Sequence, residues 1–134
     1  MFDNAEYRIG FGIGEDRHGR VIPAHTRVAS IAAIEQAAAA AFGGFTIRPV
    51  RGGWVNPAGH LVTEQGEELT LLTDDGPGVE AFAQIVGREL NQHSVVVIRP
   101  GGAAAIVAID YTDSRPRTGI PKAGEPLYTE PPGV

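Results

Sequence analysis

Hydrophobic and polar positions alternate with two different periods along this chain. Between Tyr7 and Gly14 every second residue is apolar, and the positions between them include three glycines. This pattern predicts a strand with one apolar face and one bare face. Residues 15–25 are mostly polar and contain Gly19 and Pro23, which predicts a loop.

Two segments have the spacing of amphipathic helices. Residues 26–42 predict a first helix, with Thr26 as its cap and Gly43 at its end. Its apolar stripe comprises Val28, Ile31, Ala32, Ile34, Ala38 and Phe42. A second helix is predicted with Pro77 in its first turn and Asn91 as a left-handed stop. Its apolar face comprises Val79, Phe82, Ala83, Val86 and Leu90.

The segment between the two helices predicts a β-hairpin. Residues 45–55 and 60–72 are its expected strands. Residues 56–59 have the sequence Asn-Pro-Ala-Gly, which places proline and glycine where a type I turn needs them. Gly66 predicts a bulge in the returning strand.

Two more predicted strands, residues 94–99 and 103–111, complete the order β-α-β-β-α-β with an extra C-terminal strand. This order is the ferredoxin-like plan of the α+β class, with two helices on one face of an antiparallel sheet. We predict one such domain over residues 1–111. Residues 112–134 hold five prolines and three glycines, which predicts a Pro/Gly-rich arm. The arm is either disordered or lies on a neighbouring subunit.

Composition restricts the chemistry that this chain can perform. With no cysteine and a net charge of −5, disulfides, thiolate catalysis and cysteine zinc sites are excluded, and nucleic-acid binding is disfavoured. The four histidines lack metal-site spacing, and the serines lack a nucleophile elbow. Arg48 and Arg51 form a small basic spot, but the aromatic signature of RNA-recognition domains is missing. We therefore expect no metal, no cofactor and no nucleic-acid partner.

The hydropathy of the chain predicts a cytoplasmic protein. Residues 1–8 carry charge and lack the apolar core of a signal peptide. No apolar run approaches the roughly 20 residues that are needed to span a bilayer. We therefore expect neither a membrane span nor a membrane partner.

The predicted hairpin also carries the first candidate site. Its register places Gly52 opposite Glu64 and Trp54 opposite Val62 on one face. An aromatic ring near a carboxylate suits a cationic ligand, because the ring supplies a quadrupole and the carboxylate a full charge. The alternative is that Trp54 only anchors the hairpin and Glu64 is a solvated edge charge.

Two neighbouring glutamates and a row of glycines are further candidates. Glu67 and Glu68 must point to opposite faces of the strand, and partial burial of either would raise its pKa and suit it to acid–base chemistry. The alternative is that both are solvated. The bare face of Gly10, Gly12 and Gly14 would admit either a ligand or a closely packed helix.

Several short motifs lie together in the hairpin and second helix. They are Gly52-Gly53-Trp54, Glu64, residues 67–72, Leu90-Asn91-Gln92 and residues 94–97. The set resembles the phage-encoded S-adenosylmethionine lyases, long called SAM hydrolases, over roughly residues 40–110. It is also similar to small bacterial domains of unknown function that have a Gly-x-Trp hairpin.

The resemblance implies an enzyme that splits S-adenosylmethionine into methylthioadenosine and homoserine lactone. It implies a homo-oligomer, with a trimer favoured, whose sites lie between subunits. In a phage setting the enzyme would act in the host cytoplasm and would counter restriction by depleting the methyl donor. The alternative is a non-catalytic oligomeric module, such as a phage accessory protein that binds a partner or a small ligand.

The resemblance also implies which residues form the site. The family uses a tyrosine and a glutamate of this hairpin region. Trp54 would take the aromatic position here, although indole has no phenol oxygen, and Glu64 or else Glu67 would supply the carboxylate. The substrate would lie against Trp54, Gly10, Gly12 and Gly52.

Overall fold

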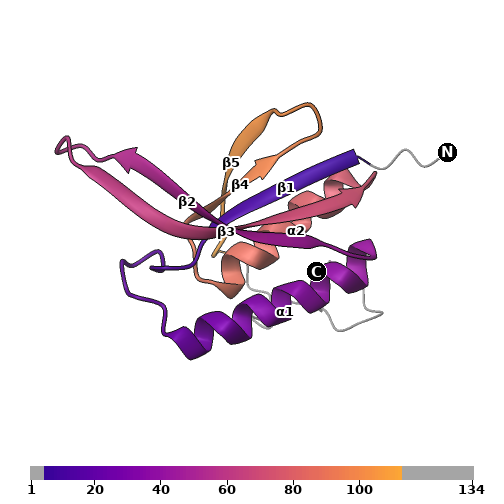
Figure 1. Ribbon diagram of the computed structural model, residues 1–134, viewed down its shortest axis with the longest axis horizontal. Coiled ribbons are helices and arrows are strands. Elements are labelled where there is room, and N and C mark those ends of the chain that lie inside the picture. Colours follow the sequence, from indigo (N-terminus) through magenta and orange to yellow (C-terminus); the bar gives the residue numbers. More distant parts are fainter. Residues whose placement is uncertain (1–4, 113–134) are drawn as a thin grey trace.

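The computed structural model, which describes residues 5–112, has two helices packed on one face of a five-stranded sheet (Figure 1). The elements are β1 (Ala5–Gly12), α1 (Ala24–Phe42), β2 (Thr46–Val55), β3 (Leu61–Thr73), α2 (Gly76–Glu89), β4 (Ser94–Ile98) and β5 (Ala104–Ala108). The strand order is β2-β3-β1-β4-β5, and every neighbouring pair is antiparallel. This confirms the ferredoxin-like prediction with its extra strand. Apart from Thr112, the predicted C-terminal arm lies outside the described residues.

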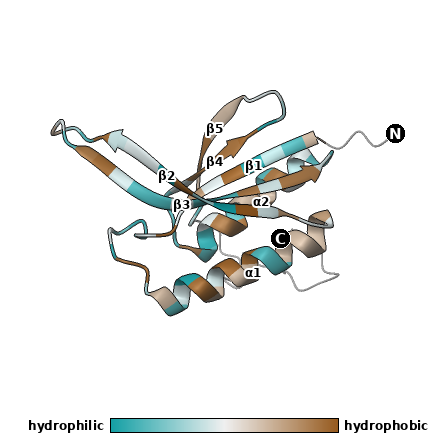
Figure 2. Ribbon diagram, in the orientation of Figure 1, coloured by the Kyte–Doolittle hydropathy of each residue, from teal (hydrophilic) through white to brown (hydrophobic). Residues whose placement is uncertain are grey.

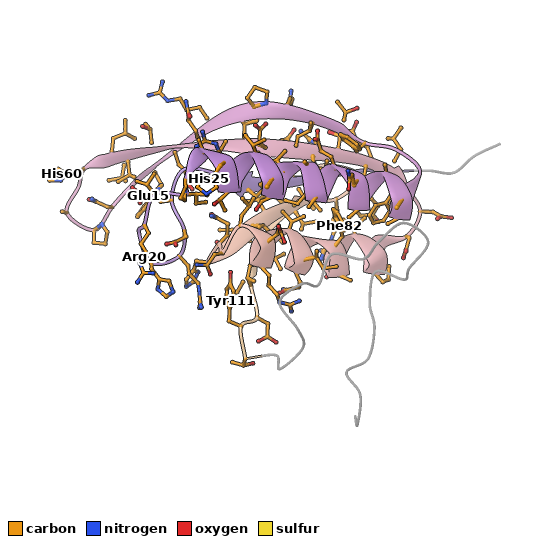
Figure 3. The ribbon with its side chains drawn as sticks, turned by 90° about the horizontal axis from the view of Figure 1, so that it is seen from below. Glu15, Arg20, His25, His60, Phe82 and Tyr111 are labelled. Carbon is orange, nitrogen blue, oxygen red and sulfur yellow. The ribbon has the colours of Figure 1, made fainter. Side chains whose placement is uncertain are left out.

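The core lies between the helices and one face of the sheet. Ile9, Leu69 and Leu71 on the central strands are fully buried, and hydrophobic and hydrophilic residues alternate along β1 (Figure 2). Phe82 of α2 lies between the two helices (Figure 3), where its ring meets Phe42 edge to face at 5.5 Å. Each such buried side chain stabilises the fold by about 1.5–3 kcal/mol. Within residues 5–112, no helix is long and apolar enough to cross a membrane.

Helix α2 begins and ends as the sequence predicts. The Asp75 carboxylate caps the helix by accepting a hydrogen bond from the Gly78 amide at 2.9 Å, and Pro77 lies in the first turn. Asn91, just after the helix, has a left-handed φ of 52°. The predicted apolar face is buried in full.

Helix α1 differs from its prediction at the start and in its buried face. It begins at Ala24 after Pro23, so Thr26 lies inside the helix and caps nothing. The buried residues are Ser30, Ile34, Ala37 and Ala38. Val28, a member of the predicted stripe, is 67% exposed. Alanines and other apolar residues are spread around the whole helix, so hydrophobic periodicity could not select the face that packs. Its predicted end is confirmed by Gly43 with φ 83°.

The β2–β3 hairpin has the predicted register and turn. Gly52 pairs with Glu64, and Trp54 pairs with Val62. At the turn, the Asn56 side chain accepts a hydrogen bond from the His60 amide at 2.9 Å. The ribbon projects beyond the rest of the sheet (Figure 1).

The predicted bulge at Gly66 is wrong. Pairing runs without interruption through Gly66 to both β1 and β2. A Cβ at this position would lie 2.5 Å from the Phe11 carbonyl oxygen, so glycine is needed for the close approach of two backbones.

Candidate functional site

The face of the sheet opposite the helices is the open face, and its character changes from one edge to the other. One row of paired residues crosses all five strands, in the order Arg48, Glu68, Gly10, Val96, Ile106. In this row charged residues therefore occupy the β2–β3 side, and exposed apolar residues the β4–β5 side. Glycine separates the two, so a ligand there would meet charge on one side and apolar surface on the other.

Three glycines leave a bare area on the charged side of the open face. These residues, Gly10, Gly12 and Gly52, are called the glycine floor below. A Cβ on Gly52 would meet nothing within 4 Å, and one on Gly10 would meet only Val96 at 3.9 Å. The sequence prediction that the glycines of β1 share a bare face is confirmed, and the helices pack on the opposite face.

Glu64 lies directly over Gly12, one of the three glycines of this floor. Its Oε1 atom occupies the place where a Cβ on Gly12 would lie, and its Cδ atom is 2.9 Å from that point. Trp54, which is 54% exposed, is on the same face one paired row further along the ribbon. The structure therefore brings together the predicted carboxylate, the indole and the bare glycines on one surface.

Glu68 on the same face is engaged in ion pairs. Its carboxylate is almost buried. The Oε1 atom accepts a hydrogen bond from Nη2 of Arg48 at 2.7 Å and lies 3.7 Å from Nη1 of Arg8. Among the described residues Glu64 has no ion-pair partner. Glu64 is therefore the carboxylate of this face that is left to meet a cationic ligand.

Glu67 lies on the helix-covered face, so the sheet separates it from Trp54. It pairs with Phe11 and borders a hollow of about 390 Å³ beside Ile13 and Pro49. Burial raises the pKa of the Glu67 carboxyl, and the negative charge of Glu35 raises it further. The expectation that the neighbouring glutamates point to opposite faces is confirmed. Because the sheet lies between them, Glu64 and Glu67 cannot both contact one molecule bound on either face.

Gln92 belongs to this site although the sequence marked it only as part of a helix end. Its side chain is 6% exposed, and its Oε1 atom is 2.9 Å from the point where a Cβ on Gly12 would lie. Its Nε2 donates to the Glu15 carbonyl at 2.9 Å and to the Leu90 carbonyl at 3.1 Å. No spacing rule signals this role, because it depends on contacts between distant segments.

The loop that supplies the Glu15 carbonyl is held by its own hydrogen bonds. The Asp16 carboxylate accepts from the backbone amides of Arg20 and His18 at 3.0 and 2.8 Å. The Arg20 hydrogen bond is the main reason that the pKa of Asp16 lies below its ordinary value. Glu15 and Arg20 lie at the end of the molecule from which the hairpin with His60 projects (Figure 3).

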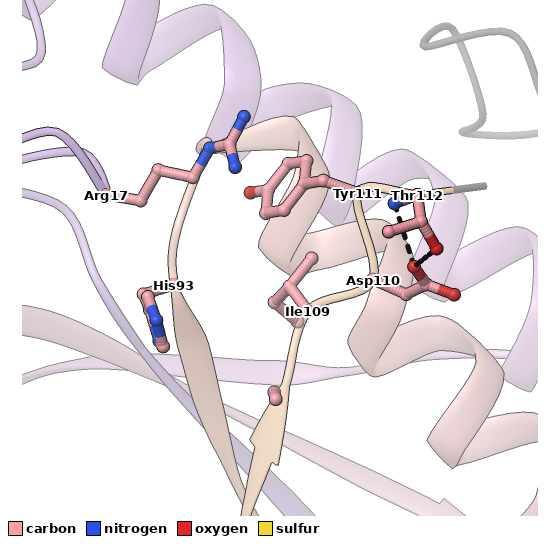
Figure 4. A pocket seen from close by; sticks show the side chains of 7 residues that line it. Arg17, His93, Ile109, Asp110, Tyr111 and Thr112 are labelled. Carbon is pink, nitrogen blue, oxygen red and sulfur yellow. Dashed lines mark hydrogen bonds between the residues drawn. The ribbon is translucent and has the colours of Figure 1, made fainter. Parts of the chain in front are cut away.

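A second contact fastens this loop to the end of β5. The Arg17 guanidinium stacks on the Tyr111 ring at 3.7 Å, and its Nε donates to the Asn91 side chain at 3.0 Å. The Tyr111 hydroxyl donates to the Gln92 carbonyl at 2.7 Å. Figure 4 shows Arg17, Tyr111 and His93 around a hollow of about 330 Å³. These contacts restrain the backbone on both sides of Gln92.

Within residues 5–112, no cluster of histidine, aspartate and glutamate could hold a metal ion. The open face offers the carboxylate of Glu64, the amide of Gln92 and the indole of Trp54.

Comparison with solved structures shows that the fold is similar to that of phage SAM lyases. A phage SAM lyase in complex with S-methyl-5′-thioadenosine matches with a TM-score of 0.58 and 18% identity, covering 81% of this chain and 92% of that one. A phage SAM lyase in the apo state matches with a TM-score of 0.50 and 18% identity, covering 83% of this chain and 94% of that one. No family model and no curated protein matches the sequence.

Proposed function

We propose that this protein is an S-adenosylmethionine lyase that works on the open face of its sheet. The observation that carries the proposal is the placement of the Glu64 carboxylate over bare Gly12, on the same face as Trp54. The fold similarity to a phage SAM lyase with bound S-methyl-5′-thioadenosine supports the same substrate class.

The proposed reaction is intramolecular and needs no protein nucleophile. One carboxylate oxygen of S-adenosylmethionine attacks its own γ-carbon, and the bond from that carbon to the sulfonium breaks. The bonding electron pair goes to sulfur, which gives neutral methylthioadenosine and homoserine lactone, so no water or proton is consumed. The two opposite charges that react are neutralised together, which a dry site favours over water.

The protein therefore has to hold the substrate in a folded conformation rather than attack it. Glu64 would bind the substrate ammonium, and the Trp54 ring would attract the sulfonium through a cation–π contact. The bare positions at Gly10 and Gly52 would leave room for the flat nucleoside. The missing phenol oxygen at Trp54 does not prevent the reaction, because no step transfers a proton to the aromatic residue.

A second subunit is part of the proposal, because a single open face is too exposed to exclude water. Exposed apolar residues on this face, Leu72, Val96 and Ile106, would suit a subunit contact. We propose a homo-oligomer, with a trimer favoured, acting in the host cytoplasm against restriction. A non-catalytic ligand-binding or phage accessory module remains the second candidate, and it is favoured by the replacement of tyrosine by Trp54.

A product assay tests the proposal. Purified protein is incubated with S-adenosylmethionine, and methylthioadenosine and homoserine lactone are measured by liquid chromatography with mass detection. Glu64→Gln removes the negative charge and is expected to lower kcat/KM about 10- to 100-fold. Glu6→Gln, at the other end of β1, is the matched charge control and should keep the wild-type rate.

Two results would contradict parts of the proposal. Wild-type protein that forms no methylthioadenosine would leave only the binding-module alternative. A loss of activity in Glu67→Gln with full activity in Glu64→Gln would move the reaction to the helix-covered face. Light scattering tests the oligomer, since an active monomer would exclude a site shared between subunits.

A further inference from the structure

We infer that Gln92 is a specificity-determining residue of this site, whose amide oxygen and the Glu64 carboxylate together recognise a primary ammonium group above Gly12. The inference rests on the proposed function, because it places a substrate group in the proposed site. Gln92 lies outside the β2–β3 hairpin, so the proposed site gains a residue from another part of the chain.

The orientation of the Gln92 amide follows from its hydrogen bonds. Both N–H groups of Nε2 are used, one by the Glu15 carbonyl and one by the Leu90 carbonyl. Turning the amide over would set its oxygen against two other acceptors, which is unfavourable. The oxygen therefore faces Gly12.

That oxygen has no donor within the part of the chain that the structure describes. Every fully buried side-chain polar atom there has a partner, so the unpaired Oε1 must reach accessible surface. A nearly buried glutamine whose one free atom is an accessible acceptor is suited to accept a hydrogen bond from a ligand.

The two acceptors define the chemistry of the group that fits between them. The Glu64 and Gln92 oxygens both lie close to the same point over Gly12, the position of a Cβ on that residue, and the Gln92 oxygen is 2.9 Å from it. A primary ammonium has three N–H donors, no acceptor and a positive charge that the carboxylate balances. A quaternary ammonium would offer charge without donors, and a neutral alkyl group would offer neither.

Two ligands that differ only in the ammonium test the inference. They are adenosine 5′-thioethers that carry a propyl or an aminopropyl group, and neither has a sulfonium that can be cleaved. Calorimetry of the wild-type protein should show tighter binding of the aminopropyl compound. In Gln92→Met this advantage should fall about tenfold, while affinity for the propyl compound stays within about twofold. An unchanged advantage, or an equal loss for both ligands, would overturn the inference.

A second variant covers the case in which Gln92→Met does not fold. Gly12→Ala places a Cβ in the space that the Glu64 carboxylate occupies and close to the Gln92 oxygen, so it displaces the two proposed acceptors. It should remove the aminopropyl advantage. Gly14→Ala is the matched control, because a Cβ there meets nothing within 4 Å. Equal behaviour of the two alanine variants would overturn the inference.

Failure of this inference can be distinguished from failure of the proposed function. Selective binding of the aminopropyl compound without methylthioadenosine production would overturn the lyase proposal and support the ammonium site. Production of methylthioadenosine, with no effect of Gln92→Met or Gly12→Ala on selectivity, would support the lyase proposal and overturn the ammonium site.

Discussion

The two faces of the sheet use the same strands in opposite ways. On β3, Leu69 and Leu71 point toward the helices and are fully buried, whereas Glu64 and Glu68 point to the open face. On β1, the apolar residues of the helix face alternate with Glu6, Arg8, Gly10 and Gly12 of the open face. One face of each strand therefore stabilises the fold while the other is available to a ligand.

The glutamates on the two faces of the sheet also have different charged neighbours. On the open face the nearly buried Glu68 is balanced by Arg48 and Arg8. On the helix face Glu67 is partly desolvated beside another acid, and its pKa is raised. The acid that is nearly buried on the open face therefore has cationic partners, whereas Glu64, on the same face, has none among the described residues.

The sharpest test of this comparison uses two adjacent leucines of β3. Leu71 is 0% exposed on the helix face, and Leu72 is 60% exposed on the open face. Leu71→Ala is expected to lower the free energy of unfolding by about 2–5 kcal/mol, because it leaves a cavity in the core. Leu72→Ala should change it by less than about 0.5 kcal/mol. Urea denaturation measures both, and similar losses would contradict the assignment of the two faces.

A smaller effect is expected from Trp54, and it should appear in binding rather than in stability. Trp54→Ala removes the proposed cation–π partner, so KM for S-adenosylmethionine should rise about 5- to 30-fold. Leu61→Ala is the control on the other face of the same ribbon. Unfolding in urea should be unchanged for both. An unaltered KM in Trp54→Ala would exclude the indole from the site.

The smallest expected effect is the pH dependence caused by Glu67. Its folded pKa is raised above the ordinary value of 4.5, so the folded state holds the proton more tightly than the unfolded chain. Stability due to this group is therefore lost as the pH rises from 4.5 through the raised value. Glu67→Gln should flatten that fall and stabilise the protein at pH 7 by up to about 0.5 kcal/mol.

Glu35→Gln serves as the graded control for that measurement. Glu35 is the lesser cause of the Glu67 shift, since burial is the larger one. Its removal should flatten the pH profile less than Glu67→Gln does. A profile that steepens in Glu67→Gln would show that the carboxylate is stabilised on the helix face rather than destabilised.

The register and the shared face that were predicted correctly depend on local rules. Trp54 and Glu64 share a face because side chains alternate along a strand and because the turn residues set the register. The start and buried face of α1 were not predicted, because an alanine-rich helix has no polar side to orient it. The bulge predicted at Gly66 was wrong, because a glycine inside a strand can also allow two backbones to approach closely.

The order of the elements, the ferredoxin-like plan and the common face of the indole and the carboxylate all follow from patterns along the chain. The position of Gln92 beside Gly12, over which Glu64 also lies, depends instead on the packing of segments that are distant in sequence. The physical reason is that Gln92 is oriented by two backbone carbonyls, one of them in the loop after β1. Such hydrogen bonds exist only after the loop, α2 and β4 have packed together, and no periodicity along the chain encodes them.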